Sequence, residues 1–302
     1  MSQIELSIAI ITMNRSDQLI EAIESCLKCS MPVSTEFVIL NNASTDDTEQ
    51  VIHKLIDENP DANIRYYYSD TNLGVGGGRG YVFDKACGKY VYFMDDDAII
   101  APECADSFFI DSIAFLKKQN HVASLTTRIR DDILGEQRNE IASDHLVDGK
   151  NLMFFYLGGS HFLKKDCFSS PLYMKIMYGL EEYAPSIRAI DQGYCHVFDG
   201  TLCIIHKPKV NKWIDGSERI KKVQIAYAAV GYATKKLLYP HIFLPILWGC
   251  YQLRCAKYLR PYKGAQKEAD EMVRKIVREN PLPKVKIRTV LYMFKMFGMT
   301  VF

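Results

Sequence analysis

Three consecutive aspartates, Asp95, Asp96 and Asp97, follow the apolar run KYVYFM at residues 89–94. Side chains alternate along an extended chain, so Asp95 and Asp97 are expected to point to the same side. Carboxylates held this close repel one another unless a cation lies between them. Mg²⁺ and Mn²⁺ both prefer oxygen ligands. The spacing therefore predicts a divalent-metal site at the end of a strand, with a solvated acidic turn as the alternative.

A glycine-rich segment, NLGVGGGRG at residues 72–80, precedes this run. Backbone without side chains approaches a ligand closely, and N–H groups at a helix start favour anions. The segment matches neither the G-x-G-x-x-G dinucleotide pattern nor the P-loop pattern G-x-x-x-x-G-K-[ST]. Arg79 within it is suited to pair with a phosphate. A flexible turn is the alternative interpretation.

Two further polar segments, TMNRS at 12–16 and NNASTDDT at 41–48, each follow an apolar run. They set polar groups where a nucleoside would lie. The alternative is helix capping, for which Ser16 and Ser44 are the candidates.

The first hundred residues alternate between two kinds of pattern. Apolar, β-rich runs predict strands at 4–12, 35–40, 63–69 and 89–94, and helical spacing predicts helices at 15–29, 44–58 and 76–87. This rhythm predicts a parallel sheet covered by helices on both faces. Ligands bind at the carboxyl ends of the strands in such sheets, and each polar segment above falls at such an end.

The pattern is less regular after residue 100. We expect a helix at 103–118, a polar loop at 128–150 and a strand, glycine turn and second strand across 153–168. A helix at 179–194 is expected to open with Glu181 and Glu182, and a strand within 195–207 ends at His206.

Taken in order, these segments resemble the family 2 inverting glycosyltransferases of the A-type fold, which use nucleotide-sugars. The T-x-N-R-like, D-N-x-S-x-D-x-T-like, N-x-G-x-x-x-G-x-x-G-like and D-x-D segments of that family appear as TMNRS, NNASTDDT, NLGVGGGRG and DDD. Its G-x-E-D-x-D-like helix start appears as GLEEYAPSIR. The resemblance covers about 200 residues. It implies an α/β fold with a Rossmann-like mixed, mostly parallel sheet of the glycosyltransferase A type, with a C-terminal helical appendage.

The resemblance also implies a set of nucleotide-sugar-binding residues. Asn41 stands where the family commonly has an aspartate that reads the base, and Asn accepts a hydrogen bond from a pyrimidine N3–H. The donor is then expected to be a UDP- or dTDP-sugar. The residues implied to border the nucleotide-sugar are Thr12, Asn14, Arg15, Asn41, Asn72, Gly74, Arg79, Asp95 and Asp96.

The resemblance implies a metal centre and a base as well. Asp95 and Asp97 would hold Mg²⁺ or Mn²⁺, with His206 completing the metal shell. Glu182 stands at the position of the catalytic base, and Glu181 is the second candidate. The alternative is that both glutamates only complement the dipole of a helix start. The implied reaction is metal-dependent, inverting sugar transfer to a hydroxyl of a glycan or lipid-linked acceptor, in polysaccharide or cell-surface glycan biosynthesis.

The charges of the 302 residues are distributed unevenly. Residues 1–205 carry 17 Lys and Arg against 30 Asp and Glu, whereas residues 206–302 carry 20 against 6. We divide the chain into a catalytic domain at 1–216 and a basic, apolar helical region at 217–302. The apolar stretch 237–253 is shorter than the ~20 residues of a spanning helix. The basic region is expected to dock on an anionic membrane surface, or else to pack on the catalytic domain or form a homodimer interface.

The N-terminus and the cysteines restrict the function and location of the protein less strongly. The N-terminus has no basic leader, and nine scattered cysteines indicate reduced packing residues. We expect a cytoplasmic protein, peripheral at the inner face of the cell membrane, with no nucleic-acid partner. One alternative is a haloacid dehalogenase-like phosphatase. In that class the D-x-D lies on the first strand, whereas three predicted strands precede the strand that ends in Asp95–Asp97 here. Another is a nucleotide-sugar-binding protein without catalysis.

Overall fold

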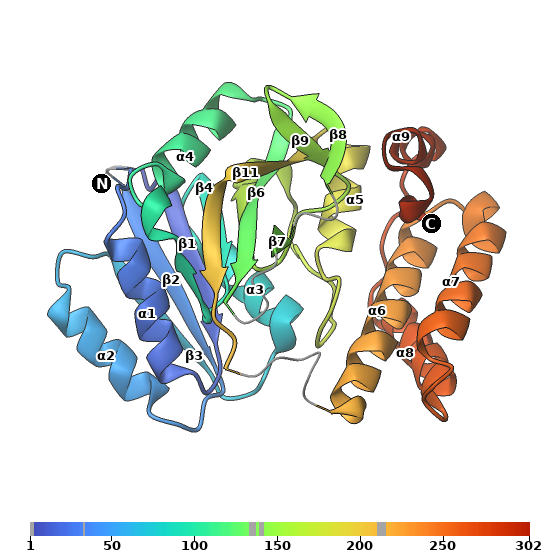
Figure 1. Cartoon of the computed structure of the whole chain (residues 1–302), viewed down its shortest axis with the longest axis horizontal. Helices are drawn as coiled ribbons and strands as arrows, with labels where there is room; N and C mark the ends of the chain where they lie inside the picture. The colour runs from blue at the N-terminus through green and yellow to red at the C-terminus, as the bar shows by residue number, and fades with distance from the viewer. Residues whose placement is uncertain (1–2, 33, 133–136, 139–141, 210–215) are drawn as a thin grey trace.

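The computed structural model describes residues 3–32, 34–132, 137–138, 142–209 and 216–302. A single twisted sheet runs through the larger part of the molecule (Figure 1). Its strands follow the order β3 (Ile64–Ser69), β2 (Thr35–Asn42), β1 (Leu6–Thr12), β4 (Tyr90–Met94), β10 (Ser160–Lys164), β6 (Val122–Asp131), β11 (Cys195–His206), β9 (Lys150–Met153) and β8 (Ala142–Val147). Two short strands lie off this path: β5 (Ala98–Ile100) pairs with β11, and β7 (Gln137–Arg138) pairs with β6.

The strand directions confirm the expected mixed, mostly parallel sheet. Strand β1 is parallel to β2 and β4, and β2 is parallel to β3. Strand β10 is antiparallel to both β4 and β6, and β6 is parallel to β11. From β3 to β11 in the described sheet, β10 alone therefore runs against its neighbours. The predicted strands at 4–12, 35–40, 63–69 and 89–94 are confirmed within two residues.

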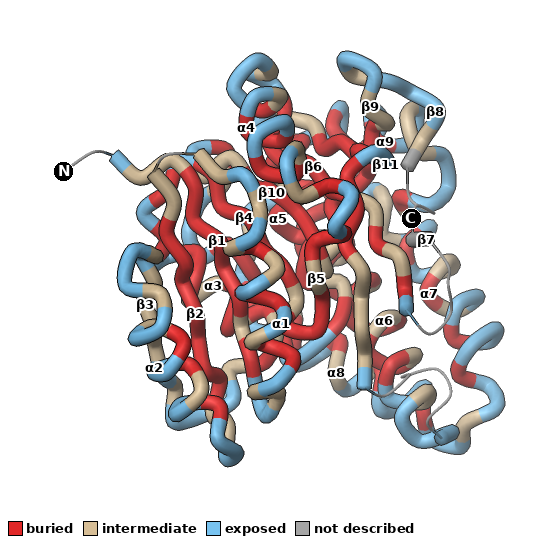
Figure 2. Tube along the Cα trace, turned by 60° about the vertical axis from the view of Figure 1, so that its left-hand side comes forward, coloured by how far each residue is buried: buried red, intermediate tan, exposed pale blue. Residues whose placement is uncertain are grey.

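Helices cover both faces of the sheet, as its apolar strands require. One face packs against α1 (Ser16–Leu27), α2 (Thr48–Glu58) and α4 (Phe108–Lys118), and the other packs against α3 (Gly74–Lys85). Alternation along β1 divides its side chains between the two cores, since Ile8 and Ile10 face the first and Ala9 faces the second. Figure 2 shows these central strands as almost continuously buried.

Two predictions about helix starts were wrong. Ser16 is the first residue of α1 rather than its cap, and neither α1 nor α2 has a side-chain cap hydrogen bond at its N-cap residue. Ser44 instead accepts a hydrogen bond from the backbone N–H of Asn14 at 3.0 Å. The serine therefore ties together the turns after β1 and β2, which both lie at the ligand-binding edge.

The polar loop expected at 128–150 is also partly wrong. Strand β6 continues to Asp131 and β8 occupies 142–147, while 133–136 and 139–141 lie outside the described residues. In β6, buried Ile129 and Asp131 alternate with the more exposed Arg128 and Arg130. That period-two pattern is the signal of a strand, but the polar composition concealed it. The helix expected at 103–118 is divided into η1 (Pro102–Cys104) and α4.

The last part of the chain is helical and packs beside the sheet (Figure 1). Its elements are α6 (Ser217–Leu238), η3 (His241–Phe243), α7 (Leu244–Tyr258), α8 (Ala265–Glu279), α9 (Ile287–Phe297) and η4 (Gly298–Val301). They share a hydrophobic core with α5 (Tyr183–Asp191) and with Phe154 and Phe155. Among the described residues, no helix combines the length and the apolar character needed to cross a bilayer.

Candidate functional site

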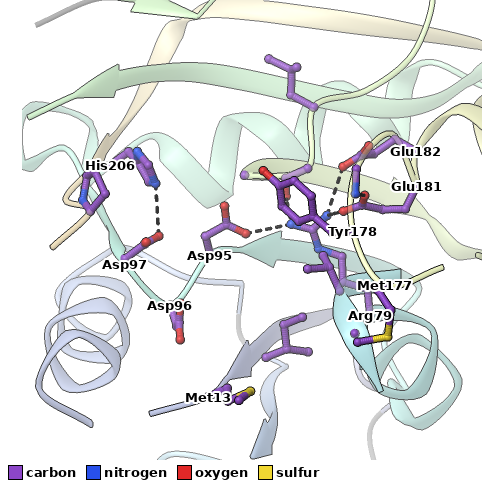
Figure 3. A pocket seen from close by; sticks show the side chains of 18 of the residues that line it. Met13, Arg79, Asp95, Asp96, Asp97, Met177, Tyr178, Glu181, Glu182 and His206 are labelled. Carbon is purple, nitrogen blue, oxygen red and sulfur yellow. Dashed lines mark hydrogen bonds and ion pairs between the residues drawn. The ribbon is translucent and has the colours of Figure 1, made fainter. Parts of the chain in front are cut away.

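A cavity of about 640 Å³ lies at the carboxyl ends of the central strands. Its walls come from the turns after β1 and β4, the start of α3, the Gly158–Gly159 turn, the segment 177–182 and the end of β11. This volume is in the range of small-molecule and cofactor sites. Figure 3 shows two groups of charged side chains in it, one around Asp97 and one around Arg79.

The first group contains the three residues that the sequence proposed as metal ligands. Asp95, Asp97 and His206 each offer one ligand atom, and these atoms lie within 4.8 Å of one another. The sheet explains their convergence, because β5 pairs with the end of β11 and places His206 opposite Ala98, next to Asp97. The two carboxylates fit Mg²⁺ or Mn²⁺, and the imidazole adds a nitrogen donor.

His206 is held between two carboxylates. Its Nε2 lies 3.3 Å from Asp97 Oδ1 and its Nδ1 lies 3.0 Å from Asp131 Oδ2. Burial lowers the pKa of His206, but these two partners outweigh burial and raise it overall. A second carboxylate on the far ring nitrogen is common around metal-binding histidines. Asp131 was not among the predicted site residues, although the register of β6 and β11 pairs it with His206.

Arg15 lies against the same acids from the turn after β1. One of its terminal nitrogens is 2.8 Å from Asp96 Oδ1 and 2.7 Å from Asp97 Oδ2. Burial raises the pKa of Asp96 to about 6 despite the Arg15 charge. For Asp97, burial also raises the pKa, but the hydrogen bond with His206 and the Arg15 charge prevail and lower it. These two partners therefore favour the ionised form of Asp97.

The second group is centred on Arg79, whose side chain is buried. One terminal nitrogen donates to Glu181 at 2.7 Å and to Glu182 at 3.1 Å. The other donates to Asp95 at 2.8 Å (Figure 3). It also donates to the carbonyl oxygen of Gly158 at 2.7 Å. The guanidinium thus connects both base candidates to a candidate metal ligand.

Glu182 has the electrostatics of a general base. Its side chain is buried, and this burial together with the adjacent Glu181 charge raises its pKa, while Arg79 opposes the rise. Glu181 has a further partner, since its second oxygen accepts the backbone N–H of Gly179 at 3.1 Å. A carboxylate whose pKa is raised toward neutrality is suited to take a proton from a hydroxyl.

The glycines of α3 serve close packing as well as the cavity. Gly74 has a positive φ of 71°, and a Cβ there would lie 2.8 Å from the Cα of Met177. The backbone N–H of Val75 donates to the carbonyl oxygen of Met177 at 3.0 Å. Glycine therefore allows the segment ahead of Glu181 and Glu182 to lie directly on the helix start.

The predicted nucleotide-binding residues divide into two sets. Those that line the cavity are Thr12, Arg15, Asn72, Gly74, Arg79, Asp95 and Asp96. Asn14 and Asn41 are not among its lining residues. Asn14 Oδ1 accepts the N–H of Thr45 at 2.7 Å, and Asn41 Oδ1 accepts the N–H of Ser44 at 2.9 Å. Asn42, which was not predicted, lines the cavity instead.

Comparison with known proteins agrees with this geometry. The family described as Glycosyl transferase family 2 matches residues 7–167, which is more than half of the chain. The chain belongs to glycosyl transferase family 2. Membership of the family excludes the phosphatase alternative, whose D-x-D would lie on a first strand rather than after β4.

Relatives in sequence match only part of this family 2 chain. An uncharacterized glycosyltransferase of Haemophilus influenzae is 31% identical over 96 residues, which is 32% of this chain and 37% of the relative. The succinoglycan biosynthesis protein ExoO of Rhizobium meliloti is 27% identical over 99 residues, which is 33% of this chain and 27% of ExoO. The chain thus spans well under half the length of these relatives.

Solved structures match over a much larger share. TarS 1–349 of S. aureus in complex with UDP-GlcNAc has a TM-score of 0.61 at 15% identity, covering 95% of this chain and 83% of that one. The mannosyltransferase PcManGT of Pyrobaculum calidifontis, in complex with GDP-Man and Mn²⁺, has a TM-score of 0.59 at 14% identity, covering 96% and 79%. At these identities the likeness establishes the fold, and the expected glycosyltransferase A-type fold is confirmed.

Proposed function

We propose that this family 2 member is an inverting, metal-dependent glycosyltransferase that moves a sugar from a nucleoside-diphosphate sugar to a hydroxyl. One observation carries the proposal. A single cavity is lined by the cluster of Asp95, Asp97 and His206 and, across Arg79, by a buried glutamate with a raised pKa. The first feature suits a divalent cation that would bind a diphosphate, and the second suits a hydroxyl that must lose its proton.

In the proposed reaction Glu182 accepts the proton of the acceptor hydroxyl as that oxygen attacks the anomeric carbon. The bond to the nucleoside diphosphate breaks on the opposite side, so the configuration inverts. Arg79 keeps the base in place and holds down its pKa. Glu181, bound to Arg79 and to Gly179, holds the start of α5 over the cavity.

The metal is proposed to be held by Asp95, Asp97 and His206. A bound Mg²⁺ or Mn²⁺ neutralises charge on a diphosphate leaving group. Asp131 orients the His206 ring through its contact with Nδ1, and Arg15 forms ion pairs with both Asp96 and Asp97.

The donor and acceptor are proposed at the level of class. The similar structures are complexes with UDP-GlcNAc and GDP-Man, which supports a nucleoside-diphosphate sugar. We propose a UDP- or dTDP-sugar first, from the resemblance to the family alone, because Asn41 does not line the cavity. The similarity to ExoO, a succinoglycan biosynthesis protein, supports a glycan or lipid-linked acceptor.

We further propose that residues 1–216 act as the catalytic domain and that residues 217–302 dock it on an anionic membrane at the cytoplasmic face. Helix α9 supports docking, because Ile287, Leu291 and Phe294 recur at helical spacing and are exposed. Trp248 and Leu253 of α7 are exposed as well, and this region is strongly basic. Flotation with phosphatidylglycerol vesicles tests this, with Leu291→Ser and Phe294→Ser expected to abolish it. Equal flotation of wild type and variants would refute docking.

The function itself is tested by sugar release. Purified protein is incubated with a panel of nucleotide-sugars and Mn²⁺, with and without chelator. We expect release from at least one UDP- or dTDP-sugar, abolished by chelator and by Asp97→Ala. Nucleotide binding without turnover of any donor would support the non-catalytic alternative instead.

A further inference from the structure

A second cavity, of about 260 Å³, lies between α6, α7 and the segment 180–183. We call it the helical cavity. Leu180 and Tyr227 line both this cavity and the larger one. Since Leu180 is two residues from Glu182, the helical cavity adjoins the side of the site from which an acceptor hydroxyl would be deprotonated.

Aromatic side chains form much of the wall of the helical cavity. Tyr183, Tyr232 and Tyr251 line it, and the last two are stacked with ring centroids 4.4 Å apart. Gly231 also lines it, and an added Cβ there would lie 3.3 Å from Leu180 Cδ1, so this glycine packs closely against the leucine. Aromatic walls with a few polar groups are typical of small-molecule sites, and rings present flat faces to the apolar side of a sugar.

Two cations lie in the same cavity. Lys235 is 7% exposed, and its Nζ donates to the backbone oxygen of Thr300 at 3.3 Å and to that of Phe302, the last residue of the sequence, at 3.1 Å. Arg254 is exposed and lies on the α7 side. Within the described part of the chain, neither forms an ion pair with an aspartate or glutamate side chain. Burial, with Arg254 adding a smaller repulsion, lowers the pKa of Lys235 to about 7. An anion bound beside Lys235 would favour its protonated form, which burial disfavours.

We propose that the helical cavity is an acceptor subsite that binds a sugar carrying an anionic group, with Lys235 and Arg254 as its cationic contacts. The inference rests on the proposed function, because it assigns the acceptor side of that reaction. Two sources share this chemistry: the carboxylate of a sugar acid, and the phosphate of a phosphorylated or lipid-linked sugar.

Binding of matched probes to the full chain separates these sources. Phenyl β-D-glucuronide is compared with phenyl β-D-glucoside, and glucose 6-phosphate with glucose, by calorimetry at low salt. We expect at least one anionic probe to bind about tenfold or more tightly than its neutral partner, as charge-assisted contacts would give. The pair that shows the difference identifies the anion. Equal affinity within both pairs, or displacement of the anionic probe by UDP with Mn²⁺, would overturn the proposal.

Three variants test the residues. Arg254→Gln is expected to reduce the preference for the anionic probe about tenfold, whereas Arg260→Gln removes the same charge outside the cavity and should have no effect. Gly231→Phe places a ring at a residue that lines the cavity and should weaken the binding of both members of a pair. Equal losses in Arg254→Gln and Arg260→Gln would attribute the preference to overall charge and refute the subsite.

Binding of UDP with Mn²⁺ is measured on the same samples. A variant of the helical cavity that loses probe binding but still binds the nucleotide would show that the effect is confined to this cavity. Probe binding by a wild-type chain that binds no nucleotide would instead contradict the proposed function and leave this subsite standing.

Discussion

The guanidinium of Arg79 lies 3.1 Å from the carboxylate of Glu182. Its other terminal nitrogen lies 2.8 Å from Asp95, so one buried cation joins the proposed base to the proposed metal site. The Arg79 charge opposes the rise in the Glu182 pKa that burial and Glu181 cause. The charge state of the base therefore depends on how this residue is held.

The two adjacent glutamates are expected to differ in function. Glu182→Gln removes the proton acceptor with little change of shape, and transfer should fall about 10²- to 10⁴-fold. Binding of UDP with Mn²⁺ should persist. Glu181→Gln should lower transfer much less, because Glu181 is proposed to hold position through Arg79 and Gly179. Initial rates and calorimetry check both variants, and a larger loss in Glu181→Gln would reverse the assignment.

The raised pKa of Glu182 predicts opposite effects of pH on activity and on stability. Activity should rise as pH passes upward through this pKa, because only the ionised carboxylate accepts a proton. The folded protein binds a proton that the unfolded chain, with a pKa near 4.3, has already lost. Between these two pKa values, the Glu182 contribution therefore lowers the unfolding free energy by up to about 1.4 kcal/mol per pH unit.

Comparison with Glu182→Gln isolates this contribution, since glutamine does not titrate. Denaturation midpoints of both proteins are measured across the pH range together with wild-type rates. Parallel stability curves for the two proteins would show that Glu182 titrates at an ordinary pKa.

The Gly158 position is predicted to control the geometry of the base. A Cβ there would lie 2.1 Å from a Glu182 oxygen and 2.5 Å from an Arg79 nitrogen. Gly158→Ala should therefore displace both side chains and reduce the transfer rate at least tenfold, with the fold retained. Gly80→Ala is the matched control, because nothing lies within 4 Å of its Cβ in α3. It should keep full activity and gain up to about 1 kcal/mol of stability; equal activities would refute the claim.

Asp131 is predicted to support metal binding through His206. Asp131→Asn removes the charge that holds Nδ1, and the affinity for Mn²⁺ should fall about 10- to 100-fold. Asp132→Asn changes the neighbouring exposed residue and should leave the affinity unchanged. Calorimetric titration with Mn²⁺ compares the two, and wild-type affinity in Asp131→Asn would remove this residue from the site.

Local patterns predicted much of the fold. The apolar runs around Ile8, Ile39 and Tyr92 alternate along the chain with segments of helical spacing. This alternation predicted the parallel part of the sheet. The candidate ligands Asp95 and Asp97 followed from their place at a strand end. His206 came from the resemblance to the family.

What was missed depends on contacts between distant segments. Asp131 meets His206 only through the pairing of β6 with β11, and no local pattern records that register. Arg79 was expected to face a phosphate, but Glu181 and Glu182, more than a hundred residues later, fold back onto it. The helical cavity likewise requires α6, α7 and the segment at Leu180 to be packed together.

The most direct test is anomalous diffraction from crystals soaked with Mn²⁺ and UDP. We predict a manganese peak bounded by Asp95, Asp97 and His206, with the diphosphate beside it in the larger cavity. A nucleotide bound there without manganese at these three residues would contradict the account.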